Sequence, residues 1–255
     1  MVVDYEKSGH LVIITLNRPD KLNAINEDMQ VALAVAWQKY QDDEDAWLAI
    51  LTANGKAFCS GADKSWFERS LRGEDSLGLF LQGINRDIYW SGRIDKPTIA
   101  AVNGLALGAG VDMVLQADLR VASEDAAFRL PEVDRGNVLI LWDNLPYAIA
   151  AELAVGTEFS ARRAHEVGMI NRLAPAGKAL AVARAWADEL LAKPPLVLER
   201  TLKVLRGIKN RNAIGSNSEL RDYTTGLSKD LVATEDWKES VDALLKRRTP
   251  RYLKR

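Results

Sequence analysis

The sequence contains very little cysteine and histidine, and this limits the chemistry available to the protein. Its 255 residues include a single cysteine, Cys59, so no disulfide can form within the chain. The two histidines, His10 and His165, lie far apart and lack cysteine or histidine neighbours at the spacing of metal ligands. We therefore expect neither a disulfide framework nor a metal site.

An excess of one charge sign and a long hydrophobic run are also missing. The formal net charge is −1 at pH 7, which gives no reason to expect nucleic acid or an anionic membrane as a partner. The longest apolar run, residues 99–115, is interrupted by Asn103 and Asp112 and is too short for a clean membrane span. The N-terminus has no signal-peptide pattern. These absences predict a cytoplasmic globular protein.

Strand and helix patterns alternate through the first two thirds of the chain. Residues 10–16 are rich in β-branched side chains, and Asn26 is a plausible cap for the helical spacing of residues 29–41. Further strands are predicted at 46–53, 96–104 and 117–123. This order is typical of a parallel α/β arrangement with right-handed crossovers.

From about residue 160 onward the pattern becomes helical. Ser160 is a predicted helix cap and Gly168 a terminator, and further helices are expected at 177–193 and 234–248. Such a helical tail after an α/β body is either a subunit interface or additional core, and we favour the interface.

The stretch GLALGAGVDMVLQAD, residues 104–118, raises a chemical question. It is almost entirely small or apolar, and Gly104 is expected to open a helix, yet Asp112 lies in its middle. A lone buried carboxylate is costly unless it is paired or neutralised. Asp112 is therefore either a satisfied structural residue or a group that moves a proton.

Five motifs in this order resemble those of one enzyme family. They are LNRPDKLNAI, GKAFCSGAD, KPTIAAVNGLALGAGVDM, AFRLPEVDRG and LLKRRTPRY, at residues 16–25, 55–63, 96–113, 127–136 and 244–252. Together they resemble the crotonase superfamily of enoyl-CoA hydratases and isomerases over nearly the whole chain. A rival interpretation of Gly108-Ala109-Gly110 as a dinucleotide-binding fingerprint is weak, because Met113 replaces the third glycine.

The resemblance implies a fold and an assembly. The fold would be α/β, a crotonase-like spiral of ββα turns over residues 1–195 that carries the acyl-CoA site. Residues 196–255 would be a helical trimerisation region, and the chain would form homotrimers or dimers of trimers. The substrate would be an acyl-CoA thioester, with coenzyme A as part of the substrate and no separate cofactor.

The resemblance also assigns an oxyanion hole and two acid/base groups. The backbone N–H groups of Ala62 and Ala109 would stabilise an enolate-like oxyanion. Asp112 and Glu132, 20 residues apart as in the family, would be the catalytic carboxylates. The alternatives from the residues alone are that Glu132 pairs with Arg135 and that Asp112 is held by a local N–H group.

The first carboxylate departs from the usual hydratase pattern. Hydratases commonly have Glu at both positions, whereas Asp at position 112 is similar to the dienoyl-CoA isomerase branch. That branch has a further Asp eight residues after the Glu, where this chain has Ile140. Asp143 either takes over that role or caps a helix that starts near residues 144–146.

The remaining assignments concern the ligand. Lys21, Leu22, Ala24, Asp63 and Lys64 fall where relatives bind coenzyme A. Trp66 and Trp142, with Asp143, would shape the acyl pocket; the alternative for the two tryptophans is that they fill the core. Cys59 has no evident His partner and is interpreted as a packing residue. The basic residues 246–248 either reach a neighbouring subunit's ligand or form a solvated helix end.

The resemblance therefore predicts an enzyme that hydrates a 2-enoyl-CoA. The alternatives are a dienoyl-CoA isomerase, a hydrolase of a thioester or a β-diketone, and a protein that binds acyl-CoA without reaction.

Overall fold

The structure is a computed structural model, and it describes residues 1–132, 134, 145–209 and 234–255. The chain forms two compact units, which we describe separately. Unit 1 comprises Met1–Ile94 and Thr98–Ala185, and unit 2 comprises Asp95–Pro97 and Trp186–Arg255. Within the described ranges, no helix is both long and apolar enough to cross a membrane.

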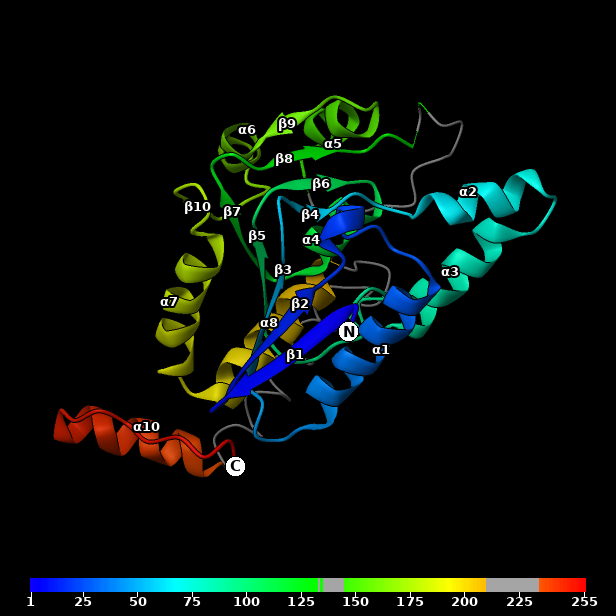
Figure 1. Ribbon diagram of the computed structural model, residues 1–255. Coiled ribbons are helices and arrows are strands. Elements are labelled where there is room, and N and C mark those ends of the chain that lie inside the picture. Colours follow the sequence, from blue (N-terminus) through cyan, green and yellow to red (C-terminus); the bar gives the residue numbers. More distant parts are fainter. Residues whose placement is uncertain (133, 135–144, 210–233) are drawn as a thin grey trace. The chain divides into compact units, whose positions relative to one another are not determined.

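A six-stranded sheet runs through unit 1 in the order β1-β2-β3-β5-β7-β10 (Figure 1). All neighbours in it are parallel except β1 and β2, which form an antiparallel hairpin. Its strands are β1 Val3–Ser8, β2 Leu11–Leu16, β3 Leu48–Ala53, β5 Thr98–Val102, β7 Leu119–Ser123 and β10 Arg172–Ala174. Every residue of β3 is buried, as is typical of a parallel strand covered on both faces.

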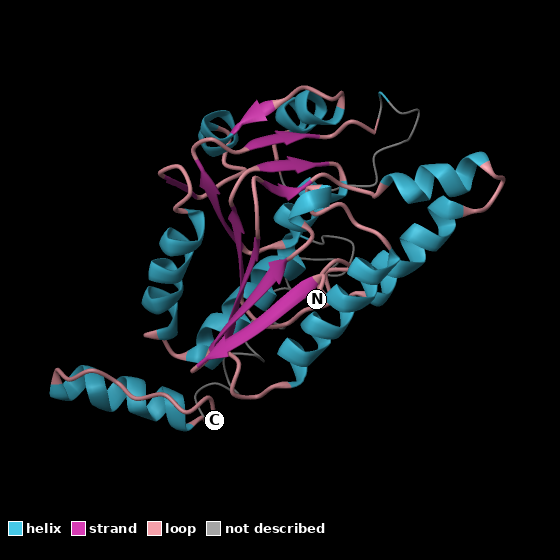
Figure 2. Cartoon of the chain, viewed as in Figure 1, coloured by secondary structure: helices cyan, strands magenta, loops and turns pink. Residues whose placement is uncertain are grey.

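A second sheet of four strands has the order β4-β6-β8-β9 (Figure 1), and Figure 2 shows its strands in magenta. Its strands are β4 Ala57–Cys59, β6 Leu105–Leu107, β8 Ala127–Arg129 and β9 Phe159–Ser160. The chain passes from β3 to β4, from β5 to β6 and from β7 to β8, so each step places one strand in each sheet. This repeated passage between the sheets is the strand arrangement of the expected spiral.

Helices connect these strand pairs. Those that lie in unit 1 are η1 Pro19–Lys21, α1 Glu27–Asp42, α2 Lys64–Leu71, α3 Ser76–Arg86, α4 Ala109–Gln116, α5 Tyr147–Ala154 and α6 Ala161–Glu166. The predicted caps are confirmed: the Asn26 side chain accepts the Met29 N–H at 3.0 Å, and Ser160 accepts the Arg163 N–H at 3.1 Å. Helix α7, Ala179–Leu191, continues from unit 1 into unit 2.

Three local expectations were wrong or incomplete. Gly104 does not open a helix, because β6 intervenes and pairs with β4 and β8, and α4 begins only at Ala109. Strand β1 was not predicted, because its C-terminal half, residues 6–8, is exposed and polar and therefore gives little hydrophobic signal. Helix α5 has Pro146 as its N-cap, so it begins after the position at which Asp143 was considered as a cap.

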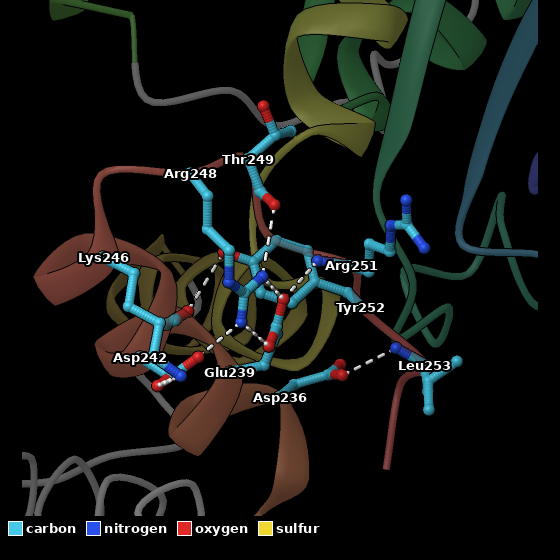
Figure 3. Close-up of polar contacts among 10 residues, drawn as sticks. Asp236, Glu239, Asp242, Lys246, Arg248, Thr249, Arg251, Tyr252 and Leu253 are labelled. Atoms are coloured by element: carbon cyan, nitrogen blue, oxygen red, sulfur yellow. Dashed lines mark hydrogen bonds and ion pairs between the residues drawn. The ribbon is translucent and has the colours of Figure 1, made fainter.

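In unit 2, the described helices are α8 Pro195–Lys209 and α10 Glu235–Lys246. The C-terminal tail folds back along α10 (Figure 1), and Figure 3 shows the polar contacts between them. The buried Asp236 carboxylate accepts the backbone N–H groups of Leu253 and Lys254 at 2.7 and 2.8 Å. Arg248 donates to Glu239 and to Asp242, with each ion pair at 2.6 Å.

This C-terminal clamp, formed by Asp236, Glu239, Asp242 and Arg248, bears on the basic residues 246–248. Lys246 forms an ion pair with Asp242 at 2.7 Å, so both Lys246 and Arg248 are engaged within the chain. The hydrogen bonds from Arg248 and from the Arg251 N–H lower the pKa of Glu239 to about 2. Contact of the basic residues 246–248 with a neighbouring subunit's ligand stays a prediction.

Candidate active site

The site begins where β4 ends. The segment after it is held against the loop that precedes α1 by three backbone hydrogen bonds: Ser60 N–H to Leu22, Ile25 N–H to Gly61, and Asp63 N–H to Ile25. Their lengths are 3.0, 2.8 and 2.9 Å. Within the described part of the chain, the Ala62 N–H donates no hydrogen bond.

The same segment lies against the start of α4. Gly61 has a φ of +87°, and a Cβ atom built on it would lie 2.9 Å from the Leu107 carbonyl oxygen and 3.7 Å from the Ala109 nitrogen. Ala109 is the first residue of α4, and its N–H likewise has no acceptor among the described residues. The free N–H groups of a helix start and the helix dipole both favour negative charge. The tertiary structure thus brings the two predicted oxyanion donors close to each other.

Glu132 lies at this helix start. Gly108, the N-cap of α4, has a φ of +50°, and a Cβ atom built on it would lie 2.6 Å from Glu132 Oε1. The other carboxylate oxygen, Oε2, is inaccessible to solvent. Any side chain at position 108 would therefore displace the Glu132 carboxylate, which explains the need for glycine there.

Asp112 is one helical turn further along α4, and its N–H donates to the Gly108 carbonyl at 3.1 Å. Its carboxylate accepts hydrogen bonds on both oxygens. Trp90 Nε1 donates to Oδ2, and Gln116 Nε2 donates to Oδ1 at 3.2 Å. The Asp112 carboxylate is therefore not a lone buried charge, because two side-chain N–H donors hold it. It lies one turn from Ala109, the first residue of α4.

Trp90 and Gln116 were both missed from the sequence. The i, i+4 spacing of Asp112 and Gln116 on one helix was a usable signal. Trp90 lies outside all five motifs, and its contact with α4 depends on the tertiary structure.

A cavity of about 700 Å³ opens beside the Ala62 segment, which is a size typical of ligand pockets. It is lined by Arg18, Lys21, Ala24, Ser60, Ala62, Asp63, Lys64, Phe67 and Leu107. Four of the five residues assigned to coenzyme A therefore lie together here. The fifth, Leu22, is absent from the lining, and its carbonyl instead holds the Ser60 N–H.

Arg18 organises one wall of this cavity and was not singled out from the sequence, although it lies inside the first motif. It forms an ion pair with Asp63 at 3.1 Å and also donates to the Ala24 carbonyl. Burial alone would raise the pKa of Asp63, but hydrogen bonds from the Ser65 N–H and from Arg18 hold it below its usual range. The wall is thus a fixed ion pair rather than a titrating group.

Trp66 is buried in an aromatic cluster, and its neighbour in the chain, Phe67, lines this cavity. Its indole N–H donates to the Ile25 carbonyl at 2.8 Å, and its ring meets Phe80 edge to face at 5.5 Å. Its role in an acyl pocket stays a prediction. Trp142 and Asp143, together with Arg135 and Ile140, lie outside the described residues.

Cys59 is suited to packing rather than to nucleophilic attack. Its side chain is fully buried, and burial raises the pKa of the thiol to about 12 despite a hydrogen bond from the Gly61 N–H. The thiolate, which is the reactive form, is therefore disfavoured.

Comparison with known proteins supports the family that the five sequence motifs resemble. The sequence profile described as "Enoyl-CoA hydratase/isomerase" matches residues 6–255. The chain belongs to the enoyl-CoA hydratase/isomerase family.

Its relatives in this family include two curated hydratases. Mevalonyl-coenzyme A hydratase SIDH of Beauveria bassiana is 35% identical over 94% of this chain and 90% of its own length. Enoyl-CoA hydratase EchA19 of Mycobacterium tuberculosis is 32% identical over 98% of this chain and 96% of its own length.

A solved structure gives the same result for the fold. The crystal structure of an enoyl-CoA hydratase from Mycobacterium tuberculosis H37Rv matches with a TM-score of 0.89 and 35% identity. The match covers 100% of this chain and 99% of that one. The expected crotonase-like α/β fold is therefore confirmed.

Proposed function

We propose that the protein adds water to the double bond of a 2-enoyl-CoA thioester. The observation that carries this proposal is the surroundings of the N-terminal turn of α4. The Ala109 N–H, the Ala62 segment and the Glu132 carboxylate meet there, and Asp112 lies one turn away. An enolate-forming reaction needs this combination of hydrogen-bond donors and proton-transfer groups.

The two N–H groups would act on the thioester carbonyl. As water adds to the β-carbon, negative charge develops on the carbonyl oxygen, and donors held in place beforehand stabilise that charge. One donor of this kind contributes about 3–4 kcal/mol to transition-state stabilisation in a known oxyanion hole. Ala62 and Ala109 are suited to the role because neither N–H is used within the described structure.

The two carboxylates would handle the water and the proton. One, as the carboxylate, accepts a proton from water as the oxygen bonds to the β-carbon, and the other, as the neutral acid, donates its proton to the α-carbon of the enolate. Transfer of the proton taken from water then restores the acid, so the net change is the addition of one water. The product is the 3-hydroxyacyl-CoA, and the reaction needs no other reactant. Glu132 and Asp112 are the proposed pair, since the Glu132 carboxylate lies against the N-cap of α4 and Asp112 lies in the first turn of that helix.

The cavity of about 700 Å³ is the proposed entry for coenzyme A. The exposed cations Lys21 and Lys64 at its lining are chemically suited to phosphate groups. Both curated relatives described above are named hydratases, which favours hydration.

A homotrimer or dimer of trimers is also proposed, and analytical ultracentrifugation would test it.

Isomerisation of a dienoyl-CoA is the second candidate, and one specific observation favours it. The first acid is Asp112 and not Glu. An isomerase would use the same N–H groups and carboxylates but would move a proton along the acyl chain without consuming water.

The test is mass spectrometry in D₂O with crotonyl-CoA, a longer 2-enoyl-CoA and a 3,5-dienoyl-CoA. Hydration adds one water, whereas isomerisation incorporates deuterium without it. Glu132→Gln should lower the hydration rate by about 10²–10⁴-fold, the usual contribution of a positioned acid or base. Glu124→Gln, which removes an exposed carboxylate in a turn, is the matched control. Equal rates in wild type and Glu132→Gln would refute the assignment.

A further inference from the structure

We infer that Trp90 is a positioning residue for Asp112, and that its indole N–H fixes the carboxylate for proton transfer. This inference rests on the proposed function. The contact that carries it is the hydrogen bond from Trp90 Nε1 to Asp112 Oδ2. Gln116 Nε2 donates to the other oxygen at 3.2 Å, so the plane of the carboxylate is defined from two sides.

The indole is itself held firmly. Trp90 is 3% exposed, and its ring meets Phe80 edge to face, with the ring centroids 6.1 Å apart and the planes at 84°. Its backbone N–H donates to Asp87 Oδ1 at 3.0 Å, and the Tyr89 N–H donates to the same oxygen at 2.8 Å. The donor therefore has little freedom to turn away from the carboxylate.

The segment that carries Trp90 is also fastened to α4 at a second point. The Tyr89 hydroxyl donates to the Met113 carbonyl at 2.6 Å, and the Tyr89 ring stacks on Trp37 at a centroid distance of 4.1 Å. Met113 lies in the last turn of α4, where carbonyl groups lack helical partners. The segment and the helix are thus joined through neighbouring residues, Asp112 and Met113.

Fixing this carboxylate has a chemical consequence. An aspartate side chain that is not held samples several rotamers, which point its oxygens in different directions. A proton-transfer group works only within hydrogen-bond reach of the proton that it transfers. Loss of the indole N–H should therefore reduce turnover rather than binding of the thioester, because the cavity that we assign to coenzyme A is lined by other residues.

The experiment compares Trp90→Phe with Trp47→Phe. Both changes keep an aromatic ring at a buried position, but Trp47 stacks on His10 and is outside the proposed site. We expect Trp90→Phe to lower kcat for enoyl-CoA hydration by about ten- to hundredfold, the usual effect of losing a hydrogen bond to a charged group, with KM nearly unchanged. Trp47→Phe should leave both constants near the wild-type values.

Asp112→Asn separates positioning from a general loss of packing. If the indole acts through Asp112, adding Trp90→Phe to Asp112→Asn should cost about twofold or less, because the coupled effects do not add. Full additivity, or a KM effect equal to the kcat effect, would overturn the inference. If Asp112→Asn itself keeps wild-type activity, the proposed role of Asp112 fails, and positioning of Asp112 for catalysis fails with it.

A second measurement is independent of turnover. The Nε1–H resonance of Trp90, assigned by its loss in Trp90→Phe, should be displaced downfield in wild type and should move in Asp112→Asn. If it does not move, the hydrogen bond is absent and the inference is wrong even in an active hydratase. If it moves while no enoyl-CoA is hydrated, the contact stands and only the proposed reaction has failed.

Discussion

Replacing Asp87 by Asn should stabilise the protein above pH 6. Asp87 is 2% exposed, and its Oδ1 accepts the N–H groups of Tyr89 and Trp90. Burial raises the pKa of this carboxyl from 3.8 to about 6, although the two N–H groups oppose the shift. An Asn side chain keeps the accepting oxygen and removes the buried charge.

The sign follows from proton binding. Between pH 3.8 and about 6 the folded state binds more protons at Asp87 than the unfolded state, so stability falls as pH rises through this window. Above pH 6 the full cost of the buried charge is present. The rise in the pKa of Asp87 from 3.8 to about 6 corresponds to about 3 kcal/mol as an upper bound, and we expect a gain of about 1–3 kcal/mol from Asp87→Asn at pH 7.5.

Urea denaturation at several pH values between 4 and 7.5 measures this effect. The difference in unfolding free energy between Asp87→Asn and wild type should be small at the acid end and should increase with pH. Asp75→Asn, which changes an exposed helix cap, controls for the loss of a carboxylate as such. A gain that does not depend on pH, or a loss at pH 7.5, would refute the reasoning.

Two further predictions concern other parts of the chain. Cys59 is fully buried and the pKa of its thiol is about 12, so a thiol-specific reagent should react with it only after unfolding, which a spectrophotometric thiol assay measures with and without denaturant. Fast reaction in the native state would show that the thiol is accessible. The C-terminal clamp should stabilise the tail at neutral pH and weaken as pH falls toward 2, because Arg248 holds the pKa of Glu239 at about 2. Glu239→Gln should therefore speed tryptic cleavage of the tail at neutral pH, followed by mass spectrometry, and an unchanged cleavage rate would contradict the clamp.

The sequence alone determined features that depend on short-range patterns. The Asn26 cap, the strand at residues 10–16 and the buried strand at 46–53 follow from local spacing, because capping and alternation act between near neighbours. The motifs also assigned Lys21 and Lys64 to one ligand, coenzyme A, and both residues line the same cavity in the structure.

Only the tertiary structure decided the surroundings of Asp112. Trp90 is 22 residues away along the chain and outside any motif, and it reaches the carboxylate because the segment 87–90 is docked on α4. The structure likewise shows strand β6 before α4, so the helix begins at Ala109 and not at Gly104 as the sequence predicted. Sequence patterns record which residues prefer a strand or a helix, whereas these outcomes depend on pairing and packing between segments that are distant along the chain.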